Sequence, residues 1–202
     1  YRSCRIFRGF LPPMELPGAY GSEEECETLE IQLTDAGGLT LLLYYTVYPE
    51  TDVITRRGEL HNDSGQNIII RKMMSLSVDL PNRGYSMVTF DGDWIRETHR
   101  HDRKLQPGRY VNESTTGNSS NRHNPGFLLA GEGTDEFRGD VYGFNLIYSG
   151  NHCGSVELSD HSLVRVMLGI SPHCFEWKLE PGGAFETPEA VMTFSSEGFN
   201  GM

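Results

Sequence analysis

The residues best suited to chemistry lie in one polar stretch of the chain, residues 91–126. Its only tryptophan, Trp94, lies between Asp93 and Ile95. An indole ring can stack on the apolar C–H face of a sugar while its N–H donates a hydrogen bond. Trp94 is therefore a candidate sugar platform. The alternative is a loop residue that anchors itself in the core.

The histidines and carboxylates around this tryptophan suggest two further kinds of site. On an extended strand His99 and His101 would share a face and could bind a metal ion, but no third ligand has a suitable spacing, so we expect no metal. Asp91 and Asp93 would also share a face, near the separation of about 5 Å that retaining glycosidases use between two carboxylates. Such aspartate pairs are more common in turns, and we predict no catalytic role for them.

A string of small polar residues, SSNRHNPG at positions 119–126, offers a third possibility. Ser119, His123 and Asp91 can be written as a serine–histidine–aspartate triad, but nothing here resembles a nucleophile elbow. The string could instead form a contact surface, or a loop held by its own side-chain hydrogen bonds. A long polar connection inside a domain is usually functional or disordered, so function is expected in this stretch. We assign no catalytic residue to the chain.

The rest of the chain consists of strand-sized apolar runs separated by turn residues. No segment keeps the three-to-four-residue periodicity of a helix. Regularly spaced strands of this kind indicate an all-β fold, an antiparallel β-sandwich formed as a single domain over residues 1–202. The predicted strands cover residues 27–34, 38–48, 52–62, 67–80, 85–90, 141–150, 153–160, 161–170, 175–183 and 187–196.

Within this series, residues 141–160 indicate a strand, a tight polar break and a second strand, and on these residues alone the stretch could be a sugar site, a metal site or only a β-hairpin. Alternate side chains of its first strand are apolar, and they are expected to pack on one face. These side chains are Tyr142, Phe144, Leu146 and Tyr148. The polar residues that follow, which end in Asn151 and His152, are expected to shape the turn.

The composition excludes several classes of partner. The formal net charge is −11, whereas nucleic acids and anionic membranes bind basic surfaces. The longest apolar run, residues 39–48, is much shorter than the roughly 18 residues of a membrane-spanning helix. The four cysteines lack the spacing of a disulfide framework, which favours reduced thiols and a cytoplasmic location. We expect no nucleic-acid partner, no membrane partner and no cofactor.

Several strings, in order along most of the chain, resemble the N-terminal β-domain of the α-galactosidases of glycoside hydrolase family 36. ETLEIQL, YYTVYPETDVITRRGELHN and MSLSVDLP resemble early strands of that domain. GDWIRETH is similar to its Gly-x-Trp-x-Arg-Glu segment, and YGFNLIYSGNH resembles its Gly-Phe-x-Leu-x-Tyr-Ser-Gly-Asn strand and turn. GNSSNRHNPG is similar to a string that reads Gly-x-Ser-Ser-His-x-x-Asn-Pro followed by an aromatic residue. Here Asn121 stands in place of that histidine, and Gly126 in place of the aromatic packing anchor.

The resemblance implies a β-supersandwich of the galactose-mutarotase type. It also implies a retaining α-galactosidase that hydrolyses terminal α-D-galactosyl residues of galactosides such as melibiose and raffinose. Its two catalytic aspartates would lie in a downstream (β/α)8 barrel, so this chain is expected to be a non-catalytic fragment that also lacks leading strands. Trp94 matches a family position that helps to wall the sugar site, and Arg96 and Glu97 are expected to set the loop.

The family further implies homo-oligomers, commonly tetramers, in whose assembly this domain takes part. Two other functions stay open beside the accessory domain of a glycosidase. One is a stand-alone carbohydrate-binding or lectin-like module, since β-sandwiches host many of these. The other is a domain whose main task is protein–protein interaction.

Overall fold

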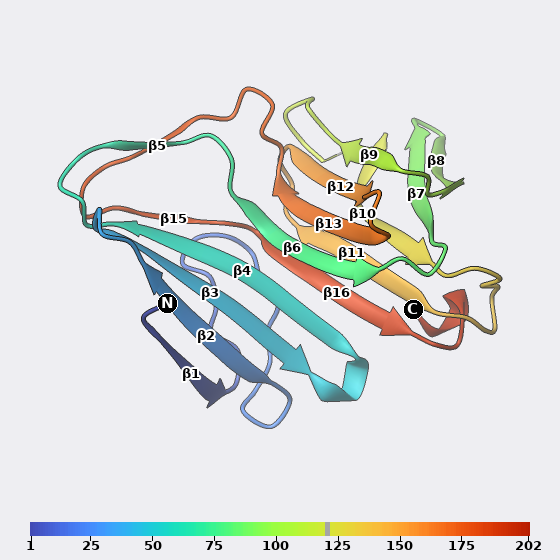
Figure 1. The fold of residues 1–202 in the computed structure, drawn as a ribbon, viewed down its shortest axis with the longest axis horizontal. Helices are drawn as coiled ribbons and strands as arrows, with labels where there is room; N and C mark the ends of the chain where they lie inside the picture. The colour runs from blue at the N-terminus through green and yellow to red at the C-terminus, as the bar shows by residue number, and fades with distance from the viewer. Residues whose placement is uncertain (120–121) are drawn as a thin grey trace.

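The chain folds into antiparallel strands arranged in two packed layers (Figure 1). The computed structural model describes residues 1–119 and 122–202. No segment within these residues forms a helix long and apolar enough to cross a membrane. The strands are β1 (Ser3–Arg8), β2 (Glu27–Thr34), β3 (Leu39–Tyr48), β4 (Val53–Asn62), β5 (Ile68–Ile70), β6 (Met74–Pro81), β7 (Ser86–Asp93), β8 (Arg96–Lys104), β9 (Gly108–Glu113), β10 (His123–Ala130), β11 (Val141–Ile147), β12 (His152–Leu158), β13 (Leu163–Ile170), β14 (Trp177–Leu179), β15 (Ala184–Glu186) and β16 (Glu189–Ser195), with 3-10 turns at Pro49–Thr51 and Phe199–Gly201.

A large sheet and a small sheet make up the two layers. The large sheet has ten strands in the order β1-β2-β3-β4-β16-β11-β10-β7-β8, with β15 beside β4. The small sheet has the order β6-β13-β12-β9. It covers only part of the large sheet, because β6 lies against β4 and β16, β13 against β11, and β12 against β10 (Figure 1). Strands β14 and β5 form a separate two-stranded sheet.

The core lies between the two layers, because alternate residues of each strand point inward. Phe127 of β10 and Phe144 of β11 are opposite each other in register, and their rings stack with centroids 5.4 Å apart. Phe144 and Leu146 are buried, and Tyr142 and Tyr148 pack against the same cluster. The predicted inward face of this strand is therefore confirmed.

The all-β, antiparallel sandwich is also confirmed, but two parts of the strand prediction are wrong. Residues 67–80 do not form one strand: exposed Arg71 and Lys72 interrupt it, and its halves, β5 and β6, belong to different sheets. The polar stretch 91–126 is not one long connection, since it contains β8, β9 and the start of β10. Strand β8 lacks apolar alternation because it lies at a sheet edge with all nine residues exposed. The short strands β1 and β15 were outside the prediction altogether.

Residues 10–25, in the connection between β1 and β2, lie over the face of the large sheet that carries Arg57 of β4, Glu186 of β15 and Glu189 of β16. The backbone N–H of Ala19 donates to the buried Glu189 carboxylate at 2.6 Å, and that of Met14 donates to Glu186 at 3.1 Å. Arg57 is 2% exposed and donates to Glu186 Oε1 at 2.9 Å. The polar side chains on this face are thus buried and paired beneath the connection.

Candidate functional site

Trp94 lies at the tip of the hairpin formed by β7 and β8, at one edge of the large sheet. Asp93 and Arg96 are paired across the hairpin, so Trp94 and Ile95 are its two loop residues. The Asp93 carboxylate accepts a hydrogen bond from the Trp94 backbone N–H at 2.8 Å. Trp94 is 82% exposed, which rules out the alternative that it anchors the loop in the core of this domain. The hairpin presents an indole ring to solvent on a short turn.

The backbone of this hairpin adopts conformations that few residues tolerate. Ile95 has a φ of 66° and Thr98 a φ of 61°, in the left-handed region that β-branched residues rarely occupy. The register of the two strands shifts just before the tip, as at a β-bulge. Gly92 is required there, because a Cβ atom would lie 2.2 Å from the Arg96 carbonyl oxygen and 2.8 Å from Glu97 Cα. Strain of this kind is characteristic of functional sites, where the surrounding structure holds it in place.

Two members of the hypothetical triad are brought together. His123 Nδ1 lies 2.8 Å from Asp91 Oδ1, across the β10–β7 pair. The Thr89 hydroxyl donates to the other carboxylate oxygen, Asp91 Oδ2, at 3.0 Å. Ser119 is held elsewhere, through its backbone N–H, which donates to the Ser149 carbonyl at 2.8 Å. Asp91 and His123 therefore act as a tie between β7 and the start of β10.

The loop before β10 is knitted by hydrogen bonds over residues 114–119. The Ser114 hydroxyl donates to the Asn118 carbonyl at 2.6 Å. The Gly117 N–H donates to the Asn151 side chain at 2.7 Å, so Asn151 supports this loop from the neighbouring turn. These bonds lie before most of the string 119–126, in which residues 120 and 121 are outside the described part of the chain, so its role as a loop or as a contact surface stays a prediction.

The metal and paired-carboxylate hypotheses gain no support from the described residues. Among residues 1–119 and 122–202, no three His, Cys, Asp or Glu side chains form a group that could hold a metal ion. His99 and His101 are exposed on β8, and His99 is opposite Asp91 in register. Asp91 is engaged by His123, and Asp93 by the backbone of the turn. Both aspartates thus shape the hairpin.

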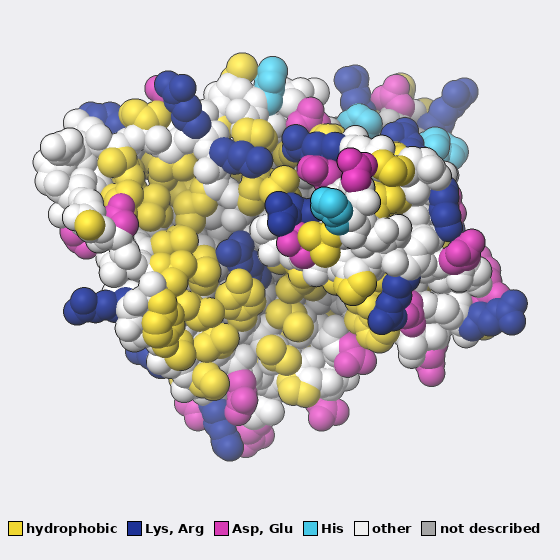
Figure 2. All heavy atoms as spheres, viewed as in Figure 1, with side chains coloured by type: hydrophobic (Ala, Val, Ile, Leu, Met, Phe, Trp, Pro, Cys, Tyr) yellow, Lys and Arg dark blue, Asp and Glu magenta, His cyan; other side chains and the backbone are white. Residues whose placement is uncertain are grey.

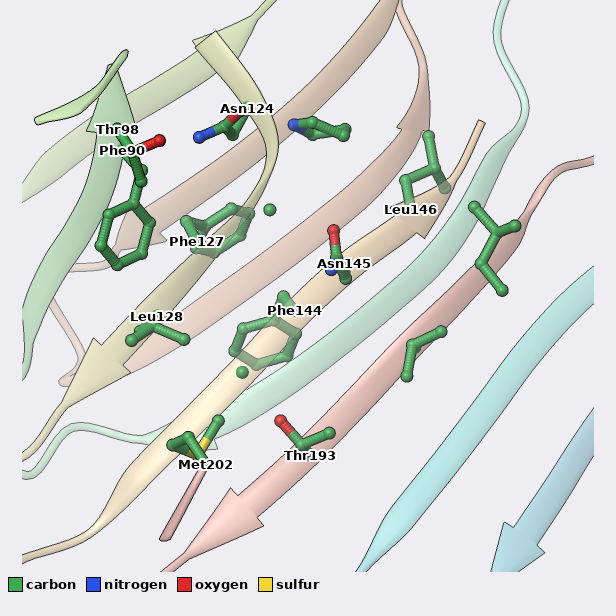
Figure 3. A pocket seen from close by; sticks show the side chains of 15 residues that line it. Phe90, Thr98, Asn124, Phe127, Leu128, Phe144, Asn145, Leu146, Thr193 and Met202 are labelled. Carbon is green, nitrogen blue, oxygen red and sulfur yellow. The ribbon is translucent and has the colours of Figure 1, made fainter. Parts of the chain in front are cut away.

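Beside the hairpin, the large sheet bears a hollow of about 560 Å³ (Figure 3). It is lined mainly by apolar residues of β7, β10, β11 and β16. Phe90 and Thr98 of the hairpin form one side, and Asn124 and Asn145 contribute amide groups (Figure 3). An apolar hollow with a few polar groups is the usual form of a ligand or docking site. The hairpin and the hollow together make up the candidate functional surface.

No pattern in the amino-acid sequence indicates that His152 is buried. The prediction that it shapes the turn is wrong: it begins β12 and is 0% exposed. Burial lowers its pKa to about 4, and the nearby His123 acts in the same direction. The imidazole is therefore neutral near pH 7, and its neighbour His123 is the residue that pairs with Asp91.

Comparison with known proteins places this arrangement in a family. Residues 1–180 match the family described as glycosyl hydrolase family 36 N-terminal domain. The chain belongs to that family. It is 41% identical to alpha-galactosidase AgaA of Geobacillus stearothermophilus, over 100% of this chain and 28% of that protein. It is 38% identical to alpha-galactosidase 2 of Hypocrea jecorina, over 100% of this chain and 27% of that protein.

Solved structures agree with the family 36 assignment. The crystal structure of AgaA superposes with a TM-score of 0.98 at 41% identity, over 100% of this chain and 28% of that chain. The galactosidase domain of the alpha-galactosidase-sucrose kinase AgaSK superposes with a TM-score of 0.94 at 32% identity, over 98% of this chain and 28% of that chain. The chain therefore has the fold of the family 36 N-terminal domain and spans less than a third of these relatives.

One of the two departures from the family 36 motif can be located. Gly126 lies on β10 and lines the hollow, where a Cβ atom would come within 2.6 Å of Asn145 Oδ1. A large side chain at this position would displace the amide of Asn145 or occupy the hollow. Asn121 lies outside the described residues.

Proposed function

We propose that this chain is the non-catalytic N-terminal domain of a retaining α-galactosidase, which hydrolyses terminal α-D-galactosyl residues of galactosides such as melibiose and raffinose. The carrying observation is Trp94, which is held almost fully exposed at the tip of a strained hairpin. The names of the relatives support the substrate class, since structures of AgaA variants are in complex with raffinose and with stachyose. The chain spans 28% of AgaA, which is compatible with a separate catalytic domain in the whole protein.

The separate roles of this chain and of the catalytic domain follow from the mechanism of retaining glycosidases. One carboxylate attacks the anomeric carbon, and a second, about 5 Å away, protonates the leaving oxygen and later activates water. The aspartates beside Trp94 are engaged in the hairpin, Asp91 with His123 and Asp93 with a backbone N–H. We place both catalytic carboxylates in a (β/α)8 barrel outside this chain. The contribution of the chain is then a surface that stacks on galactose and excludes water from one side of the site.

The exposed apolar tip of the hairpin is the reason why we propose that it contacts the catalytic barrel. Trp94 and Ile95 are 82% and 78% exposed, and two large apolar side chains at one tip lose unfavourable contact with water when they are covered. We propose a homo-oligomer, a tetramer, for the whole protein.

The four free cysteines, Cys4, Cys26, Cys153 and Cys174, support a cytoplasmic location, where thiols stay reduced.

The first test is hydrolysis of a chromogenic α-galactoside by the whole protein that contains this chain. An α-glucoside and a β-galactoside serve as substrate controls. Turnover of the α-galactoside alone is the expected result. A folded whole protein that binds galactosides without cleaving them would overturn the proposal in favour of a carbohydrate-binding module.

Trp94→Ala tests the role of the indole in the same assay. We expect kcat/KM to fall at least about tenfold, because a stacking contact near the reacting sugar is lost. Phe137→Ala is the matched control, since Phe137 is 80% exposed in a different loop. Equal kinetics for the two variants would remove Trp94 from the sugar site.

A further inference from the structure

A second hollow, of about 470 Å³, is lined by residues of β14 and β15. Hydrophobic side chains gather around β5 and β15 in the space-filling view (Figure 2). Trp177 of β14 and Phe185 of β15 line the hollow, and the connection of residues 10–25 contributes Glu15 among others. The function proposed above does not use any of these residues. Their chemistry therefore points to a separate task.

Three aromatic rings stand together in this hollow. Phe185 is 6% exposed, and the rings of Trp177 and Phe175 have their centroids 5.5 Å and 6.0 Å from its own. Phe185 is itself fixed in a cluster with Ile70 and Leu179. Trp177 is held by this packing, yet it stays 49% exposed. A half-exposed indole ring that is held in place by its neighbours can stack on the apolar face of a sugar ring.

The free edge of β15 places backbone polar groups beside these rings. Gly183 accepts a backbone hydrogen bond from β4 at 3.0 Å, and Thr187 donates one to β4 at 2.8 Å. Phe185 lies midway between them, so the bonds to β4 fall on alternate residues. The backbone N–H and C=O groups of Ala184 and Glu186 therefore point away from β4. Both residues line the hollow, and among the described strands only β4 pairs with β15.

The charges of the hollow suit a neutral ligand that is rich in hydroxyl groups. The Glu186 carboxylate lines it, but Arg57 donates to that carboxylate at 2.9 Å and neutralises it. Glu15 is exposed, and its carboxylate can accept hydrogen bonds from hydroxyl groups. A purely apolar ligand would leave the backbone groups of β15 without partners. A sugar has an apolar face for the rings and hydroxyl groups for the backbone.

We propose that this hollow is a second galactoside-binding site, in which a galactosyl ring stacks on Trp177 and its hydroxyl groups bond to the backbone of β15 and to Glu15. The axial hydroxyl group of galactose leaves one face of its ring covered by C–H groups, which is the face that an indole ring contacts. The choice of galactose among sugars rests on the proposed function, whereas the choice of a sugar rests on the hollow itself.

The site lies apart from the Trp94 hairpin. Strands β16, β11 and β10 lie between β4, which pairs with β15, and β7, which leads to Trp94. Four strand spacings of about 4.8 Å make roughly 20 Å. One sugar ring cannot contact both surfaces, so Trp94 and Trp177 can be tested separately.

Retention of the whole protein on galactose-bearing agarose tests this site. With plain agarose as the reference, we expect Trp177→Ala to reduce the retention at least about fivefold. Its kcat/KM for the chromogenic α-galactoside should change less than about twofold, which also shows that the variant is folded. Phe137→Ala removes another exposed aromatic ring and should be retained like the unaltered protein. Equal retention of Trp177→Ala and the unaltered protein would overturn the proposal.

Glu15→Ala is the second variant, because an exposed position tolerates it even if loss of Trp177 destabilises the domain. We expect it to lower retention at least about twofold with little change in kcat/KM. Full retention of Glu15→Ala would count against the site. A parallel loss of kcat/KM and retention would also overturn the proposal, because the hollow would then serve the reaction itself.

Two further readouts separate this site from the Trp94 hairpin and from other ligands. Trp94→Ala should lose catalytic efficiency and keep its Trp177-dependent retention. A whole protein that shows this retention but no hydrolysis would overturn the proposed function alone. Free galactose should elute the protein from the column, whereas elution by tetramethylammonium and not by galactose would assign the rings to a cation and overturn the sugar site.

Discussion

Asp91 and His123 are 32 residues apart in the chain, and their side chains meet at 2.8 Å between Oδ1 and Nδ1. The pair joins β7, the strand that leads to Trp94, with the first residue of β10. It lies at the base of the hairpin, where Asp91 also accepts a hydrogen bond from Thr89. The contact fixes the direction in which the hairpin projects.

Asp91→Asn should weaken this tie without abolishing hydrolysis by the whole protein. The His123 side chain is 52% exposed and that of Asp91 21%, so we expect a loss of about 1 kcal/mol or less in the free energy of unfolding. The turnover number should fall less than about tenfold. In a true serine–histidine–aspartate triad, replacing the aspartate by asparagine misorients the histidine and lowers kcat by about 10⁴-fold. A fall of that size would support the triad hypothesis.

Ile95→Gly should stabilise the domain while it harms the site. Glycine adopts the φ of 66° without the strain that isoleucine carries, so thermal denaturation should shift upward by an amount equivalent to about 0.5–1 kcal/mol. The more mobile tip should raise KM for the α-galactoside. Val111→Gly is the control, because Val111 is exposed on β9 without a positive φ and should be destabilised. A lower melting temperature for Ile95→Gly would show that its backbone is not strained.

Glu186→Gln should destabilise the domain strongly. It leaves the buried Arg57 guanidinium without its closest carboxylate and weakens the bond to Met14 in the covering connection. Removal of one partner of a buried ion pair costs about 3–5 kcal/mol, and the amide should recover part of this. We expect a large fall in melting temperature and faster proteolysis within residues 10–25. Asp79→Asn, which breaks an exposed pair with Arg165, should have a clearly smaller effect.

His152 should make the domain sensitive to acid. Its folded pKa of about 4 lies below the value of about 6.5 in an unfolded chain, so the folded state binds fewer protons between these values. Its contribution to stability is complete above pH 6.5 and is lost as the pH falls toward 4, by about 3 kcal/mol in total. Hydrogen exchange in β12 should report this loss, and His152→Leu should flatten it. An identical pH profile in the variant would assign the acid sensitivity to other groups.

The fold was predictable where strands show apolar alternation or turn residues at their ends. Strand β2 begins and ends at the predicted residues, and β11 packs the predicted face inward. Strand β8 was not predictable in this way, because an edge strand exposed on both faces carries no hydrophobic pattern. The split between β5 and β6 depends on tertiary pairing with different partners, which the apolar run of residues 67–80 does not encode.

In the candidate site, too, some features were predictable from the sequence and others were not. Residue type and motif pointed to Trp94, and the two-residue turn around it explains its exposure. The pairing of Asp91 with His123 joins segments 32 residues apart, so the sequence alone could not show which members of the hypothetical triad meet. The burial of His152 depends on tertiary packing near His123 and Asn124 of β10, which no local pattern reveals.

The charged edge strand β8 has a consequence for self-association. Its nine exposed residues, RETHRHDRK, contain six cationic or ionisable nitrogen side chains and two carboxylates. A neighbour that tried to add a strand along this edge would have to desolvate these groups and place like charges opposite one another. The charges on β8 thus disfavour amyloid-like, edge-to-edge pairing with another chain. The hairpin can therefore remain exposed during synthesis without starting aggregation. Only its apolar tip, Trp94 and Ile95, is then available for hydrophobic contacts.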